Sequence, residues 1–109
     1  MNPSVAQIRQ LNDQFRKRLE GGLVFMTPGV AALGPAAVHR IAETVATFDD
    51  FHQANDPHHE HDFGSFNAEG QTVFFKIDYF DHRLREHSPD PADPAVTTRV
   101  ITIMLAEEY

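Results

Sequence analysis

The dipeptide Glu69-Gly70 constrains the fold most strongly, because it separates two segments with the composition of β-strands. The second segment, residues 71–80, is rich in aromatic and β-branched side chains, which favour strands. A two-residue connection with glycine at its second central position is typical of a tight β-hairpin. We therefore predict a hairpin with strands at residues 62–68 and 71–80.

The position of this turn also predicts the register of the hairpin. Paired residues in an antiparallel hairpin have numbers with a constant sum, so Phe66 faces Val73 and Gly64 faces Phe75. Gly64 has no side chain and leaves room for an aromatic ring at that pair. Alternation along the second strand places four apolar side chains on one face: Val73, Phe75, Ile77 and Tyr79.

The first part of the chain predicts a helix followed by a short strand. Ser4 and Gln7 have the spacing of a capping box, and Gly21-Gly22 is a typical helix end. The apolar residues recur at helical spacing: Val5, Ile8, Leu11, Phe15 and Leu19. Four basic residues fall on the other side, where we expect solvent: Arg9, Arg16, Lys17 and Arg18. The apolar run 23–27, bounded by glycine and proline, predicts a strand.

Two further helices are predicted. One begins near Gly34-Pro35 and buries a stripe of Val38, Ile41, Val45 and Phe48. The other covers residues 94–108, with Asp93 as its N-cap and Pro94 in the first helical position. Its apolar residues surround much of the helix, so we expect it to be the most buried element: Val96, Val100, Ile101, Ile103, Met104 and Leu105.

These elements predict one α+β domain with the order α-β-α-β-β-α. The sheet is expected to be small and mostly antiparallel, with a central hairpin and with helices packed on one face. A chain of 109 residues is long enough for one core and too short for a second domain.

The composition excludes several classes of function. There is no Cys, and therefore no disulfide, thiolate nucleophile or Cys-based zinc site. The formal net charge is −7, and a general nucleic-acid binder needs a basic face, so we expect no direct nucleic-acid binding. The chain shows no signal peptide, and its apolar runs fall far below the ~20 residues that span a bilayer. We expect a cytoplasmic protein that does not bind membranes.

The densest polar run is residues 55–62, which includes His58, His59 and His61. Imidazoles and carboxylates bind divalent metals. The spacing matches no helical His-x-x-x-His motif, and the run is too crowded for every member to face one ion. The alternative is a solvated polar loop. We expect no tightly bound metal ion and no other cofactor.

A second candidate site follows from the hairpin register. On the face opposite Val73, the register places Phe63 across from Lys76 and His61 across from Asp78. His61 beside a carboxylate could act as a general base, with Lys76 as an electrophile or anion anchor. The alternative is an ordinary solvent-exposed sheet face with a cross-strand charge pair. The proline-rich residues 88–94 are interpreted as a stiff connector.

The chain resembles a family of short bacterial proteins catalogued only as a domain of unknown function, number 3768. The resemblance rests on motifs spread along the chain: residues 8–13, 27–30, 55–64, 76–81, 88–94 and 102–109. His58-His59 replace an aromatic-glycine pair of the family, which weakens a metal site built on those two histidines. The motifs draw attention to His61, Lys76 and Asp78, and they add candidate binding residues: Glu60, Asp62 and Asp81.

The resemblance implies a context rather than an activity, because such proteins are encoded in alphaproteobacterial genomes, including plasmids and integrated mobile elements. Our leading hypothesis is a small acidic, non-enzymatic binding or regulatory protein that acts on a host defence or nucleic-acid-processing system through another protein. No phosphate loop or nucleophile elbow is present. The alternative is a small hydrolytic or metal-assisted enzyme that uses His61, Asp78 and Lys76.

Overall fold

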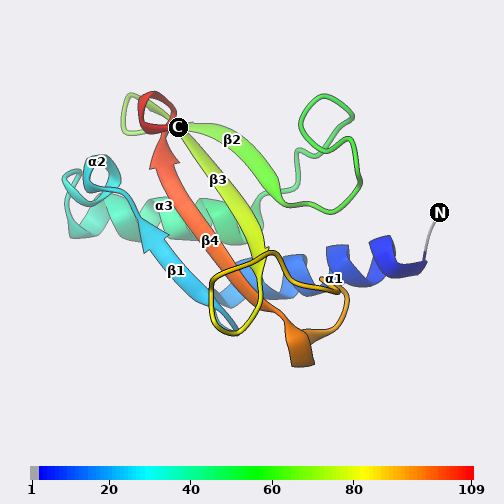
Figure 1. The fold of residues 1–109 in the computed structure, drawn as a ribbon. Coiled ribbons are helices and arrows are strands. Elements are labelled where there is room, and N and C mark those ends of the chain that lie inside the picture. Colours follow the sequence, from blue (N-terminus) through cyan, green and yellow to red (C-terminus); the bar gives the residue numbers. More distant parts are fainter. Residues whose placement is uncertain (1–2) are drawn as a thin grey trace.

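The computed structural model describes residues 3–109, which form a four-stranded sheet with helices on one face (Figure 1). The helices are α1 (Pro3–Arg18), α2 (Pro28–Ala31) and α3 (Pro35–Thr47). The strands are β1 (Leu23–Met26), β2 (Phe63–Ala68), β3 (Gln71–Phe80) and β4 (Thr98–Leu105). Two 3-10 turns, η1 (Pro94–Val96) and η2 (Ala106–Glu108), flank β4.

The strands lie in the order β1-β4-β3-β2. The β1–β4 pair is parallel, and the other two pairs are antiparallel. α1 and α3 lie against the same face of the sheet (Figure 1). Between them is the core, whose completely buried residues include Ile41, Val45, Phe75, Ile101 and Ile103. The prediction of an α+β fold with a mostly antiparallel sheet is confirmed.

The predicted hairpin is also confirmed, including its register. Phe66 pairs with Val73, Gly64 with Phe75, and Phe63 with Lys76. A Cβ atom on Gly64 would lie 2.3 Å from Cε2 of Phe75 and 2.7 Å from Cε1 of Phe48. The missing side chain therefore makes room for two core rings.

We expect Gly64→Ala to lower the free energy of unfolding by about 1–3 kcal/mol, because the new methyl group overpacks the core. Urea unfolding monitored by circular dichroism measures this loss. The neighbouring Ser65→Ala changes an exposed residue and serves as the control, with an expected change below about 0.5 kcal/mol. Equal stabilities of the two variants would contradict the close packing at Gly64.

The predicted helix over residues 94–108 is wrong, because most of this segment forms β4 in the middle of the sheet. Side chains on both faces of β4 are buried, Val100 and Met104 on one face and Ile101 and Ile103 on the other. A strand buried on both faces lacks the alternation of apolar and polar residues, so its pattern resembles that of a buried helix. The observed element order consequently ends in a strand and a 3-10 turn.

The start of the expected terminal helix is right, although its length is not. Asp93 caps η1, and its side chain accepts a hydrogen bond of 2.9 Å from the backbone N–H of Ala95. Only one 3-10 turn follows before the β-branched run of β4 begins, and β-branched side chains favour strands. A correct cap therefore predicts where a helical turn begins but not how far it extends.

The predictions for the first half hold with changes at the ends of the elements. α1 begins at Pro3, so Ser4 lies inside the helix rather than at its N-cap, and the helix ends at Arg18. Leu19 and Gly21 then adopt positive φ values of 53° and 97°. β1 and α3 lie where they were predicted, whereas the four-residue α2 was not predicted.

Candidate functional site

The expected pair of His61 and Asp78 does not form. β2 begins only at Phe63, and His61 has a positive φ of 57°, which takes the chain out of the hairpin register. Its imidazole turns toward α1, where Nδ1 lies 2.9 Å from Oδ1 of Asp13. Asp78 instead lies 3.2 Å from the ammonium group of Lys76 on the same strand. The geometric basis for a site of His61, Asp78 and Lys76 is therefore lost.

The loop before β2 holds His61 in its observed place. Oδ1 of Asp56, which is buried, accepts hydrogen bonds of 3.0 Å from the backbone N–H groups of Glu60 and His61. Oδ2 of Asp56 is 3.6 Å from Nε2 of His61. The imidazole also stacks on the ring of Phe51, with centroids 3.9 Å apart. The polar run 55–62 thus builds a loop that presents His61 to α1.

Glu60 belongs to a buried polar network that fastens this loop to the sheet. Tyr79 donates a hydrogen bond of 2.7 Å to its carboxylate, and Asn12 donates one of 2.9 Å to its carbonyl oxygen. The Asn12 amide also donates to the Tyr79 hydroxyl and accepts from Nε of Arg99. Burial raises the pKa of the Tyr79 hydroxyl far above its ordinary value. Through these hydrogen bonds Glu60 attaches the loop to α1 and β3.

Asp62 and Asp81 lie in different surroundings. Partial burial raises the pKa of Asp62, and the neighbouring Glu60 carboxylate raises it further. The side chain of Asp81 accepts a hydrogen bond of 3.0 Å from the backbone N–H of Arg85, and this bond lowers the pKa of Asp81. Asp81 therefore organises the turn after β3.

Within residues 3–109, no group of three or more metal-ligating side chains comes together around a common point. Of the three neighbouring histidines of the polar run, His58 and His59 are exposed, whereas the His61 imidazole lies against Asp13 and Asp56. No helix in the described part of the chain is both long and apolar enough to cross a membrane.

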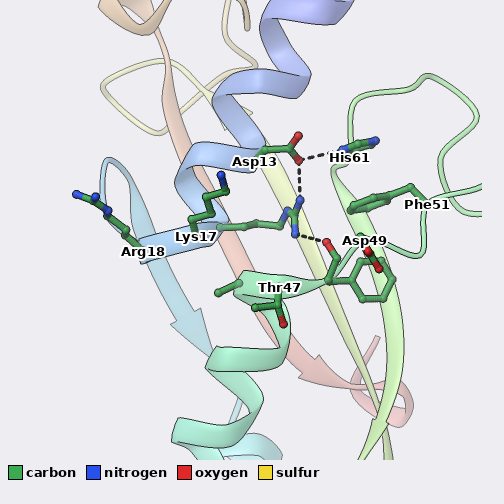
Figure 2. Close-up of a pocket in the computed structure, with 10 residues that line it drawn as sticks. Asp13, Lys17, Arg18, Thr47, Asp49, Phe51 and His61 are labelled. Atoms are coloured by element: carbon green, nitrogen blue, oxygen red, sulfur yellow. Dashed lines mark hydrogen bonds and ion pairs between the residues drawn. The ribbon is translucent and has the colours of Figure 1, made fainter.

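A groove of about 620 Å³ lies between the end of α1, the end of α3 and the loop that carries His61 (Figure 2). Arg16 forms its base and is almost completely buried. Its guanidinium group donates to Oδ1 of Asp13 at 2.6 Å and to the carbonyl oxygens of Val45 and Phe48, both at 3.0 Å. The same group lies 4.9 Å from the centroid of the Phe51 ring. Arg16 thus joins the two helices to the loop.

Arg16 and Asp13 were not predicted as site residues, and the position of Arg16 corrects our expectation that it faces solvent. The sequence carries a signal for it, because Ile8, Asn12 and Arg16 follow one another at intervals of four, and residues at this spacing share a helix face. Ile8 and Asn12 are buried too. The buried face of the helix is therefore wider than its apolar residues alone indicate. It includes two polar residues, Asn12 and Arg16.

No α-helix of residues 3–109 lies over the opposite face of the sheet (Figure 1), which we call the open face. Its apolar members include Leu23, Phe25, Phe63, Phe74 and Tyr109 beside the buried Val100 and Met104, and its charged members include Lys76 and Asp78. Phe25 on β1 is 54% exposed, and Tyr109, whose ring packs edge-on against Phe63 and Phe74, is 75% exposed. The open face therefore presents aromatic surface that a partner could cover.

β1 is also an outer strand of the sheet (Figure 1). The backbone N–H of Thr27 donates to the carbonyl oxygen of Ile103 in β4. Because backbone groups point alternately to the two sides of a strand, those of Phe25 also point to β4, and those of Val24 and Met26 point away from the sheet. The strand has the sequence Leu-Val-Phe-Met and carries no charge.

Two family motifs that lie far apart in the sequence meet beside this strand. Oε1 of Glu108 accepts hydrogen bonds from the Thr27 hydroxyl at 2.6 Å and from the backbone N–H of Leu105 at 2.9 Å, and Oε2 accepts one from the backbone N–H of Gly29. The bond from Thr27 contributes most to lowering the pKa of Glu108. The motif at residues 27–30 and the end of the chain therefore form one structural unit.

The comparisons with known proteins place the chain in a family. The model of the family described as "Protein of unknown function (DUF3768)" matches residues 26–108. No curated protein and no solved structure matches the chain. The matched residues include the loop that holds His61, the hairpin and the central strand β4, whereas α1 and most of β1 precede them. On this match, which covers most of its length, the chain belongs to the DUF3768 family of proteins of unknown function.

Proposed function

We propose that this protein is a non-enzymatic binding protein that takes up an extended segment of another protein along the free edge of β1. The observation that carries this proposal is that β1 is an uncharged, apolar outer strand with a half-exposed phenylalanine. Outer strands expose unpaired backbone groups, and proteins commonly protect them with charges, proline or a covering element. An uncharged apolar edge suits the addition of a partner strand.

The open face beside β1 supplies side-chain contacts for the same partner. A segment that pairs with β1 places every second side chain on the open face, beside Leu23 and Phe25. These two side chains are 37% and 54% exposed. Backbone hydrogen bonds then contribute affinity, and the fit of these side chains contributes specificity. We therefore expect a partner segment that is extended and has apolar residues at alternate positions.

The family resemblance indicates the kind of cellular system to which such a partner belongs. Genes on plasmids and integrated elements benefit from products that bind host proteins, so the proposed partner belongs to a defence or nucleic-acid-processing system of a bacterial cytoplasm. Binding to another protein also accords with a chain of net charge −7, which would repel nucleic acid itself. The enzymatic alternative needs His61 beside Asp78 and Lys76, but the His61 imidazole contacts Asp13, whereas Asp78 and Lys76 pair with each other.

Capture from a host extract with matched variants tests the proposal. Phe25→Lys places a charge on the proposed edge, and we expect it to weaken capture of the partner at least about tenfold, a loss of roughly 1.4 kcal/mol. Leu84→Lys makes the same change at another exposed apolar residue, 47% exposed, and should capture as the wild type does. Thermal melting of both variants establishes that they are folded.

Three results would contradict the proposal. The first is equal capture by wild type and Phe25→Lys. The second is equal loss in both lysine variants, which would indicate a general response to charge. The third is a wild-type homodimer in sedimentation analysis that Phe25→Lys dissociates, because β1 would then pair with a second copy of the chain rather than with another protein.

A further inference from the structure

We propose that the groove at the end of α1 binds a small organic anion, with a carboxylate or phosphate group held by Lys17 and an apolar body placed against Phe48 and Phe51. This site is separate from the edge of β1, because it lies on the helix-covered side of the sheet and is formed by α1, α3 and the loop before β2 (Figure 2). Its volume of about 620 Å³ falls within the range of about 300–1,000 Å³ that is typical of ligand sites.

The apolar wall of the groove is held in place before any ligand binds. The rings of Phe48 and Phe51 pack edge to face, with centroids 4.9 Å apart, and Phe48 packs in the same way on the core residue Phe75. His61 stacks on Phe51 from the loop side. Arg16 donates to the backbone of Phe48. Because neighbouring side chains already fix both rings, ligand binding costs little side-chain conformational entropy.

The charges at the groove favour an anion. Arg16, Lys17 and Arg18 end α1, so three of the nine Lys and Arg residues of an otherwise acidic chain gather here. Arg16 is neutralised by Asp13. Lys17 and Arg18 are exposed, and the side chain of neither forms a hydrogen bond or ion pair with any residue from 3 to 109. The groove is also lined by two carboxylates, Asp49 and the Asp13 that pairs with Arg16.

Stabilising the end of α1 does not account for these two cations by itself. Basic residues in a last helical turn interact favourably with the helix dipole, but neither the Lys17 nor the Arg18 side chain donates a hydrogen bond to a carbonyl oxygen of the described chain. In Figure 2 the Lys17 side chain lies between Arg18 and Asp13, and Arg18 extends away from His61 and Phe51. Lys17 is therefore the proposed anchor, and Arg18 adds positive potential at the rim.

Titrations followed by NMR test this site with four defined probes: benzoate, phenyl phosphate, benzyl alcohol and inorganic phosphate. We expect benzoate or phenyl phosphate to shift the amide signals of Lys17, Phe48 and Phe51, and the more effective of the two identifies the anionic group. The affinity should fall as the ionic strength rises. Benzyl alcohol lacks the charge and inorganic phosphate lacks the apolar body, so each should bind at least about tenfold more weakly.

The double variant Lys17→Gln/Arg18→Gln should lose about tenfold in affinity for the preferred anion. Arg83→Gln/Arg85→Gln removes the same charge from two exposed residues of the turn after β3 and should bind as the wild type does. Equal loss in both double variants would show a general charge effect and overturn the proposal. Equal binding of benzyl alcohol, equal binding of inorganic phosphate, or no shift with either organic anion would overturn it as well.

Discussion

A chain that ends at Asp93 is expected to have no cooperative unfolding transition. β4 lies between β1 and β3, so its removal divides the sheet and leaves β1 without a hydrogen-bonded neighbour. Ile101 and Ile103 are completely buried, and Val100, Met104 and Leu105 are nearly so. Burying each such side chain contributes about 1.5–3 kcal/mol, and their sum is comparable to the roughly 5–15 kcal/mol by which domains are stable.

A chain that ends at Leu105 is the matched control for this truncation. It keeps β4 and loses Glu108, which receives hydrogen bonds from Thr27 and Gly29. We expect this shorter chain to unfold cooperatively at a reduced melting temperature. Circular dichroism and calorimetry of both truncated chains distinguish the two cases. A sharp unfolding transition in the chain that ends at Asp93 would contradict the central place of β4.

Replacing Arg16 by methionine is expected to lower the free energy of unfolding by about 2–4 kcal/mol. Methionine keeps the apolar stem but removes the donors to the carbonyl oxygens of Val45 and Phe48. Asp13 is then left with His61 as its hydrogen-bond partner. Because these acceptors lie at the junction of α1, α3 and the loop before β2, their loss should loosen all three.

Two further variants show whether the Arg16 contacts cause this loss. Lys17→Met changes the adjacent, exposed residue and should alter the unfolding free energy by less than about 0.5 kcal/mol. Adding Asp13→Asn to Arg16→Met removes the carboxylate that lost its guanidinium partner and should recover part of the loss. If Arg16→Met were as stable as Lys17→Met in urea unfolding, the junction would not depend on the buried guanidinium group.

The hairpin was predictable because its determinants are local. A two-residue turn at Glu69-Gly70 fixes the register by counting, and Gly64 opposite Phe75 follows from it. The helix α3 was predictable for a similar reason, since one apolar stripe and a proline in the first turn define it. These elements carry their own signals, and tertiary contacts only add to them.

β4 was not predictable in the same way, because its signal depends on neighbours. A strand whose side chains are buried on both faces has apolar residues at nearly every position. The helices that cover one face of β4 and the strand β1 beside it are distant from it in sequence. The run of β-branched residues Val100, Ile101, Thr102 and Ile103 favours a strand. The cap formed by Asp93 and Pro94 indicates a helix, and it governs one turn only.

The candidate site shows the same limit at the level of single residues. The register of the hairpin correctly pairs Phe63 with Lys76, but it cannot be extended two residues to His61, where the chain takes a positive φ. The partner of His61 is Asp13, 48 residues away on α1. Contacts of this kind depend on how a helix packs on a loop, which no local pattern in either segment determines.

Hydrogen exchange at the backbone of β1 tests the proposed function most directly. In the free protein, the outward amides of Val24 and Met26 should exchange faster than the amide of Phe25, which points to β4. In the complex with the captured partner, the amides of Val24 and Met26 should become protected, and those at the outer edge of β2 should not change. Unchanged exchange at Val24 and Met26 in a saturated complex would contradict strand addition at β1.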